Sequence, residues 1–524
     1  MKAAAIVALL AALVTGHAMD LPTSKIDPVV ASYVQNASTV PSVVVEFAAT
    51  PAFDASALAR LPRPDRLATI TTLLETTARQ SQGGVLELIL DALTNDPSLQ
   101  AQSYYISNRI FLSHASASLV LAIAADPAVS LVRTAIPDGQ LLGFVTSPIQ
   151  NDATSAGNLV AWPIERIKAP SAWQRGVRGA NVVVGTIDSG VRHTHKSLNS
   201  TYRSDHGWFD ATGGASPSPI DYSGHGTAVT AAAVGGAPAA TWMACAACQN
   251  GRCTERAMTA CAQFMLCPSS VEGSTAECGL APHVIVNGWH TDAASWFTPV
   301  LVAWKVGGIV PVFGSGVTQQ LVDGVSPRQC STVAGPASSD LALAAVPTNV
   351  DDSVTEFGRF GPAQEYRVKP DIAAPGNAVR TADASADDAY IVRSGASLAA
   401  GYTGGAVALY LSAFPHATFE DIFVALTTSA ARTKSVGLRC GGLPDDSFPN
   451  NVAGAGRLDI SLALGVVSAP PNNLMSAKVP TATTTTDSPS VLVGITTNAP
   501  SNGTHDRNAT AAPTDTIAFA NSET

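Results

Sequence analysis

This sequence has few charged residues. Only 13% of its 524 residues are Asp, Glu, Lys or Arg, and the net charge of −10 is spread thinly. No run of Lys and Arg forms a basic stripe, so we expect no nucleic-acid-binding surface. Long apolar runs are also missing. The stretch from Ala3 to Thr15 is too short to span a membrane, and the chain is long enough for two or three domains and a large core.

The first residues are typical of a secretory signal. Lys2 precedes the apolar run and small residues follow at Gly16 and Ala18, which predicts a signal peptide over residues 1–18. At the other end, the composition shifts to Thr, Ser, Pro and Asn after about Ala469. No apolar period continues there, so residues 469–524 are predicted to be a disordered tail. The sequence therefore predicts a secreted, extracellular protein.

The cysteine and asparagine patterns agree with secretion. Eight cysteines, an even number, suit an oxidising compartment. Cys245-x-x-Cys248 could indicate zinc or redox chemistry, but no second matching pair exists, so disulfides are favoured and their pairing is left open. Acceptor triplets for N-glycosylation occur at Asn36, Asn199, Asn502 and Asn508.

Residues 19–150 read as a small α+β domain that could fold by itself. A broken helical period runs from Asp65 to Ala92, with Gly83-Gly84 as the predicted break. A further helix is predicted over Ser116–Ala125, and strands over Ser42–Phe47, Tyr104–Leu112 and Val129–Arg133. The segment Gly139–Gly157 has no firm period and is interpreted as an exposed linker.

Residues 156–468 alternate strand and helix patterns. Such alternation predicts a mainly parallel sheet with helices on both faces, an α/β fold in three layers. The predicted strands are Val182–Ile187, Trp242–Ala246, Val284–Asn287, Ile309–Phe313 and Leu341–Val346. The predicted helices are Ala228–Val234, Phe297–Val306 and Leu398–Ala413.

Three polar residues stand at the ends of these apolar elements, where α/β sheets carry their chemistry. Asp188 ends a buried strand, His225 opens one helix and Ser397 opens another. Each context is rich in glycine, which lets other backbone approach closely. Singly they would be a capping aspartate, a packed histidine and an ordinary helix start. Together, the order Asp, His, Ser is one of the known orders of the acyl-transfer triad.

The surrounding blocks resemble the subtilisin-like serine proteases, the subtilases, in the bacillopeptidase F-like branch. The resemblance covers roughly residues 162–458. It rests on Val183–Val191, Gly224–Thr227, Trp242–Cys245, Pro282–Trp289, Cys330–Val333, Val368–Gly376 and Ser394–Ala400. It implies a subtilisin-like catalytic domain over 156–468, preceded by an inhibitory propeptide over 19–150.

The resemblance also implies roles for single residues. Ser397 would be the nucleophile and His225 the general base, with Asp188 orienting the imidazole. A polypeptide substrate would lie as an extended strand along the edge formed by Gly288, Trp289 and His290, near Gly314. The chain's own propeptide would act as its inhibitor.

Several positions depart from the family pattern. Ser315 stands where the family has the asparagine that donates to the oxyanion, and Ala396 replaces the usual threonine before the nucleophile. Losing one such donor costs about 10²–10³ in turnover, so a slow enzyme is expected. His290 replaces a glycine beside the specificity pocket. Further departures are Ala228 for a histidine and Gly401-Tyr402 for a Pro-His pair.

No metal or cofactor is predicted. His193-x-His195 could suggest a metal, but a surface loop is favoured, and Asp371 is read as structural. Calcium sites are common in subtilases, yet no acidic loop here demands one. The function expected is that of a monomeric, secreted serine endopeptidase made as a self-inhibited precursor. The alternative is a catalytically impaired subtilase fold that acts as a binding or decoy protein.

Overall fold

The computed structural model describes residues 23–37, 39–141, 162–214, 216–270, 273, 275–293, 295–318 and 328–465. Contacts divide the chain into two units, Met1–Ser468 and Ala469–Thr524, and every described residue belongs to the first. The predicted signal peptide, the predicted tail, most of the predicted linker and the sequons at Asn502 and Asn508 lie outside the described residues.

The N-terminal part of the chain forms a four-stranded antiparallel sheet with the order β2-β3-β1-β4. Its strands are β1 (Thr39–Phe47), β2 (Gln100–Tyr104), β3 (Arg109–Ser116) and β4 (Val129–Arg133). Its helices are α2 (Pro28–Asn36), α3 (Ala55–Ala59), α4 (Arg63–Asn95) and α5 (Ala117–Ala124). Successive side chains of a strand point to opposite faces. Accordingly, Val43 and Val45 pack into the core of this part, whereas Val44 packs into a core shared with the following domain.

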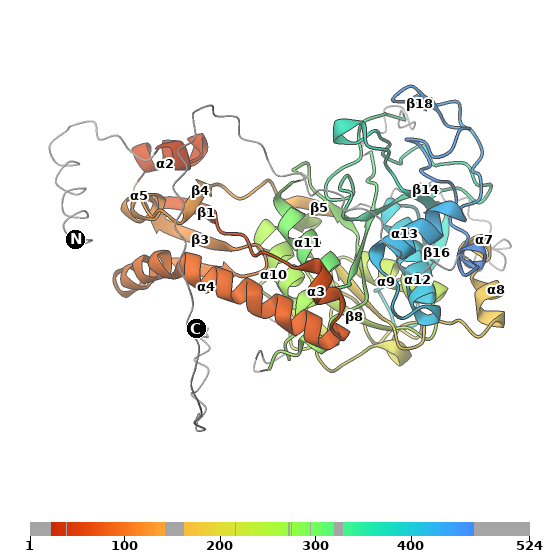
Figure 1. The fold of residues 1–524 in the computed structure, drawn as a ribbon, viewed down its shortest axis with the longest axis horizontal. Coiled ribbons are helices and arrows are strands. Elements are labelled where there is room, and N and C mark those ends of the chain that lie inside the picture. Colours follow the sequence, from red (N-terminus) through yellow and green to blue (C-terminus); the bar gives the residue numbers. More distant parts are fainter. Residues whose placement is uncertain are drawn as a thin grey trace, which may run out of the picture. The chain divides into compact units, whose positions relative to one another are not determined.

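Two predictions for this part are wrong. The helix α4 is unbroken across Gly83-Gly84, as its continuous ribbon in Figure 1 shows. Gly84 serves close packing instead, because a Cβ there would lie 2.6 Å from the carboxylate of Asp126. The predicted strand Tyr104–Leu112 is in fact a hairpin, since a turn at 105–108 separates β2 from β3.

The second part is built on a seven-stranded parallel sheet with the order β15-β14-β13-β11-β6-β8-β7. The strands are β6 (Val183–Asp188), β7 (Trp208–Asp210), β8 (Thr241–Ala246), β11 (Val284–Asn287), β13 (Val310–Gly314), β14 (Leu343–Thr348) and β15 (Ile372–Pro375). Their side chains alternate between two cores. Val284 and Val286 pack with α9 (His225–Gly236) and α12 (Ala396–Ala413), whereas Ile285 packs with α10 (Glu255–Leu266) and α11 (Thr298–Val306). This is the predicted three-layer α/β fold.

Shorter elements complete the domain. They are α7 (Trp162–Arg166), α8 (Ala169–Gln174), α13 (Phe419–Thr428), α14 (Ile460–Ala463), β16 (Val379–Ala382), β17 (Tyr390–Arg393), β18 (Arg439–Cys440) and β19 (Leu443–Pro444). Four disulfides join all eight cysteines: Cys245–Cys261, Cys248–Cys253, Cys267–Cys278 and Cys330–Cys440. The preference for disulfides over a zinc or redox pair is confirmed.

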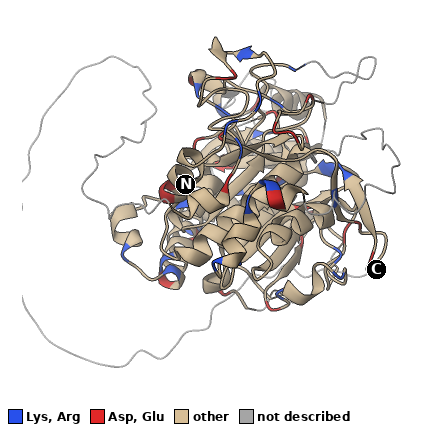
Figure 2. Cartoon of the chain, turned by 90° about the vertical axis from the view of Figure 1, so that its right-hand side faces the viewer, with Lys and Arg blue, Asp and Glu red and all other residues tan. Residues whose placement is uncertain are grey.

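Charged side chains are scattered over the described elements in Figure 2, in keeping with their low number. Within the described ranges, no helix has both the length and the apolar character needed to cross a membrane. A second small sheet, with the order β12-β5-β10-β9, holds strands from both parts of the chain. Its strands are β5 (Gly139–Leu141), β9 (Cys248–Gln249), β10 (Arg252–Cys253) and β12 (Trp289–His290).

Candidate active site

Asp188 and His225 form the centre of the site. Asp188 is the last residue of β6, and His225 is the first residue of α9, next to Gly224 with a φ of 80°. Both side chains are buried, and Nδ1 of His225 donates to Oδ1 of Asp188 at 2.7 Å. Nδ1 thereby carries a proton, and Nε2 is the nitrogen that a general base would use. This is the geometry of a histidine held ready as a general base.

A second carboxylate, Asp221, holds the start of α9 in place. One of its oxygens accepts from the backbone N–H of Gly224 at 2.8 Å and from Ser189 Oγ at 2.7 Å. The other accepts from the backbone N–H of Thr227 at 2.8 Å. Ser189 Oγ in turn accepts from the N–H of Gly226 at 3.0 Å, so Asp221 ties the residues on both sides of His225 to the end of β6. Asp221 is not among the site residues predicted from the sequence.

Ser397 is buried at the second position of α12. Helices α9 and α12 pack closely along parallel paths, because a Cβ on Gly401 would meet the carbonyl of Val229 and one on Gly405 would meet that of Ala233. Gly401 thus lies opposite Val229 and Gly405 opposite Ala233, so the two helices keep the same spacing of four residues. Four residues before Gly401 and Val229, this register places Ser397 opposite His225. We therefore expect the two side chains to lie together.

Ser315 follows the end of β13, the strand two places from β6 in the sheet. Its hydroxyl is fully buried and has no hydrogen-bond partner in the structure. Val317, two residues on, packs with Ala396 at the start of α12. An unpaired buried hydroxyl costs free energy and so needs an explanation, of which a catalytic role is one. Ser315 therefore lies beside the entrance of α12 with its hydroxyl unused.

The segment β5 lies as a strand between β12 and β10. Leu141 pairs with Trp289 and Gln140 with His290 on one side, and Gln140 pairs with Arg252 on the other. The prediction that residues 139–157 form an exposed linker is wrong for 139–141; the rest lies outside the described residues. The sequence gives no local sign of this strand. β5 has only three residues and its partners are distant in the chain, so no apolar alternation could reveal it.

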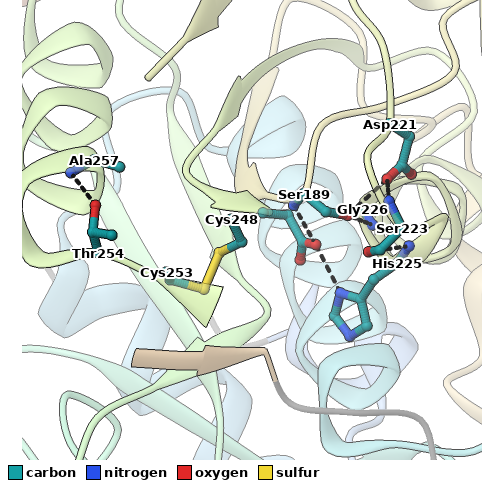
Figure 3. The surroundings of a disulfide bond; sticks show 10 residues. Ser189, Asp221, Ser223, His225, Gly226, Cys248, Cys253, Thr254 and Ala257 are labelled. Carbon is teal, nitrogen blue, oxygen red and sulfur yellow. Dashed lines mark hydrogen bonds and ion pairs between the residues drawn. A yellow bond between two sulfur atoms is a disulfide. The ribbon is translucent and has the colours of Figure 1, made fainter. Parts of the chain in front are cut away.

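The β9–β10 hairpin forms the wall opposite β12. Figure 3 shows its disulfide, Cys248–Cys253, on the segment neighbouring His225 and Asp221. Asn250 and Gly251 form the turn, both with positive φ. An Asn-Gly pair is a strong hairpin signal. This wall of the site could have been predicted from that pair, but the sequence analysis missed it.

The predicted substrate-binding residues surround these strands. Gly288 lies against the base, because a Cβ there would sit 2.8 Å from Cε1 of His225. Trp289 is buried in an aromatic cluster. The centre of its ring lies 5.2 Å from that of Phe297 and 5.3 Å from that of Phe313. His290 is buried too, and burial, with a smaller effect of Arg359, lowers its pKa to about 4. Gly314 is a buried residue of β13.

Unpartnered buried atoms gather at this edge of the sheet. They are Asp188 Oδ2, Asn287 Oδ1, Trp289 Nε1, His290 Nδ1 and Ser315 Oγ. Native proteins leave few buried polar groups without a partner, and a catalytic or binding role is one explanation for those that remain. The carboxyl ends of β6, β11 and β13 are therefore the candidate site.

The remaining histidine and aspartate candidates have structural surroundings. His195 is fully buried, not on a surface loop as predicted; its Nε2 is 2.8 Å from the carbonyl of Ala389, and its Nδ1 accepts from Ser197 N–H at 3.1 Å. Asp371 is buried and accepts from Lys369 Nζ at 2.6 Å and from the N–H of Ala344 at 2.7 Å. Across the described ranges, no three His, Cys, Asp or Glu side chains converge into a metal-binding group.

A parallel α/β sheet with an aspartate–histidine pair at its carboxyl edge and a serine at a neighbouring helix start defines a serine-hydrolase type of site. Comparison with known families identifies the family. The model of the subtilase family matches residues 179–456, more than half of the chain. The chain therefore belongs to the subtilase family. The fold and the family predicted from the sequence are confirmed.

Several known proteases are similar to the chain. Bacillopeptidase F of Bacillus subtilis (strain 168) is 28% identical over 432 residues, which is 76% of this chain and 28% of that protein. The major intracellular serine protease of the same organism is 38% identical over 90 residues, 17% of this chain and 27% of that protein. An alkaline protease of Shouchella clausii is 39% identical over 90 residues, covering 16% and 20%. The chain thus spans under a third of the length of each.

Proposed function

We propose that the chain is a secreted serine endopeptidase, made as a precursor that its own N-terminal part inhibits. Residues 1–18 would be removed as a signal peptide, 19–150 would serve as propeptide, 156–468 would be the protease and 469–524 a tail. The observation that carries the proposal is the buried Asp188–His225 pair, in register with Ser397, on a subtilase scaffold. The four disulfides are consistent with an oxidising, extracellular setting.

The chemistry follows from these three side chains. Ser397 Oγ attacks the carbonyl carbon of the peptide bond while Nε2 of His225 takes its proton. Asp188 keeps Nδ1 protonated and stabilises the imidazolium that forms. His225 then returns the proton to the leaving amine, which departs as the acyl bond to Ser397 remains. Water, activated by the same histidine, releases the new carboxyl end.

The oxyanion of the tetrahedral intermediate is the weak point. Its donors would be the backbone N–H of Ser397, at the positive end of α12, and Ser315. A serine hydroxyl is shorter than the asparagine amide of other subtilases, so a bridging water would complete the contact. The unpartnered Oγ of Ser315 supports this role, since it has a hydrogen bond left to make. We expect a turnover about 10²–10³ below that of an enzyme with asparagine there.

The N-terminal part would inhibit by occupying the place of the substrate. Its strand β5 pairs on both edges, with β12 and with β10, as an extended peptide would. Buried ion pairs fasten it nearby. Glu255, at the start of α10, has a buried side chain; it accepts from Arg133 at 2.6 Å and from the N–H of Ile136 at 2.9 Å. Glu46, itself in the N-terminal part, holds Arg133 and Arg109 in place at 2.9 Å each.

A fluorophosphonate probe tests the proposal. The purified, processed protein should become labelled covalently, and the Ser397→Ala variant should not. Asp371→Asn is not a suitable control, because it would break the buried ion pair between Asp371 and Lys369. Ser394→Ala is matched instead, being a buried serine three residues away. Labelling of wild type and Ser394→Ala but not of Ser397→Ala supports the enzyme; absence of labelling in correctly folded, processed protein overturns it.

One rival function has an observation in its favour. Ser315 and Ala396 leave the oxyanion with fewer side-chain donors than the family pattern supplies. A lineage that had given up catalysis could keep the fold and bind extended polypeptides in the space that β5 fills. This binding or decoy protein would remain unlabelled by the probe yet bind peptides once β5 is removed.

A further inference from the structure

Gly139, the first residue of β5, lies in a confined place. It is buried and pairs with Cys253 of β10. A Cβ at this position would lie 3.1 Å from Cε of Met258, 3.1 Å from Cγ2 of Thr291 and 3.2 Å from the carbonyl oxygen of His290. Its φ is not in the left-handed region. Space, and not backbone conformation, is therefore what requires glycine here.

The three walls have little freedom to retreat. Met258 is fully buried in α10, within the core that also holds Trp289, Phe297 and Phe313. Protein interiors are packed as densely as organic crystals, so this side chain can retreat only if its neighbours also shift.

Thr291 is fixed by hydrogen bonds on both sides of its side chain. Its backbone N–H donates to the carbonyl of Gly335 at 2.9 Å, and its Oγ1 donates to that of Ala293 at 2.9 Å. Oγ1 also accepts from Nε1 of Trp296 at 3.1 Å. The third wall, the His290 carbonyl, is backbone of β12 itself. A methyl group would need shifts of a few tenths of an ångström, and a branched or longer side chain has no room.

We infer that the enzyme selects polypeptides with glycine at the position that pairs with Cys253, and that Met258 and Thr291 determine this selectivity. The inference rests on the proposed function, because it takes β5 to lie where a substrate lies. The substrate class is an extended peptide with glycine a fixed number of residues before the cut. Alanine is a poor substitute there, and valine and leucine are excluded.

Peptide kinetics measure the selectivity directly. The new N-terminus of the processed enzyme, read by mass spectrometry, first gives the number of residues between Gly139 and the cut. Peptides that carry Gly, Ala, Val or Leu at the same distance are then compared by kcat/KM. We expect Ala to fall about tenfold below Gly, and Val and Leu by about a hundredfold or more. Equal rates for all four peptides would overturn the inference.

A pair of methionine variants assigns the selectivity to its wall. Met258→Ala removes the atoms nearest the missing Cβ and should bring the alanine peptide to within about threefold of the glycine peptide. Met265→Ala is the matched control, since it is an equally buried methionine on the same helix whose sulfur faces Gly185 instead. Relaxed selectivity in both variants, or in neither, would contradict the assignment.

A third measurement does not depend on catalysis. In the Ser397→Ala precursor, Gly139→Val should force β5 out from between its two neighbours. Amide hydrogen exchange of residues 139–141 and of Trp289 and His290 should then speed up by tenfold or more, whereas Gly139→Ala should change it less. Unchanged exchange in Gly139→Val would sink the steric claim, whatever the probe labelling says. Absent labelling with increased exchange would instead overturn the proposed protease and leave the confined position standing.

Discussion

Around His225, Oδ1 of Asp188 and both oxygens of Asp221 accept hydrogen bonds that fix the imidazole and the helix carrying it. Across the site, the hydroxyl of Ser315 has no partner, and Ala396 offers none. Under the proposed function, the first region would serve proton transfer, and the second would stabilise the charge that develops on the substrate. The contrast is the basis of our proposal that this chain keeps the groups that move a proton while it holds the oxyanion weakly.

The largest effect should come from the proton-transfer region. Replacing the base in His225→Ala should lower kcat by about 10⁴-fold or more, since the serine then has no group to take its proton. Hydrolysis of a fluorogenic peptide measures the loss. His193→Ala is a control with a histidine outside the pair. If both variants kept their activity, His225 would not be the general base, and the region around it would not serve proton transfer.

The oxyanion region should respond in the opposite direction. Ser315→Asn supplies a longer donor and should raise kcat by about 10²–10³ with little change in KM. Ser315→Ala, which only removes the hydroxyl, serves as the control. It should lower kcat, by a smaller factor than Ser315→Asn raises it. A fall in kcat for Ser315→Asn would mean that the oxyanion is held by other groups.

His290 links the substrate edge to pH. Burial holds its pKa near 4, below the ordinary value of 6.5. The folded state therefore stays unprotonated where the unfolded chain binds a proton, and stability falls as the pH drops from about 6.5 toward 4. The gap corresponds to about 3 kcal/mol. In the Ser397→Ala precursor, denaturant unfolding at pH 7 and pH 4.5 should show a smaller loss for His290→Gln than for His290 itself. An equal loss of unfolding free energy in both proteins would contradict the assignment of this pH dependence to His290.

Asp221 should give the smallest change. Asp221→Asn weakens the bonds that fix both sides of His225, so kcat should fall about tenfold while KM stays constant. Asp210→Asn is matched, since Asp210 accepts from Thr212, Ser216 and Tyr222 without touching α9. An equal fall of kcat in both variants would make Asp221 no more than a structural residue.

Most strands of the parallel sheet could be predicted from the sequence, whereas the strand β5 could not. Period and motif predicted β11 to the residue and the three polar positions, because buried parallel strands read as apolar runs. The positions of β5 and of the Cys330–Cys440 pair, 110 residues apart, depend on partners that the local pattern does not contain. Gly83-Gly84 misled for a related reason: packing against Asp126 outweighed the low helix propensity of glycine.

The fate of the precursor tests the central claim most directly. Expressed whole, the chain should cut itself within a few residues after Leu141, and mass spectrometry of the mature N-terminus should show that cut. His225→Ala and Ser397→Ala should leave the precursor intact, and Ser315→Asn should cut faster than the wild type. An uncut wild-type precursor, or the same cut in His225→Ala, would contradict the assignment of Asp188, His225 and Ser397 as a working triad.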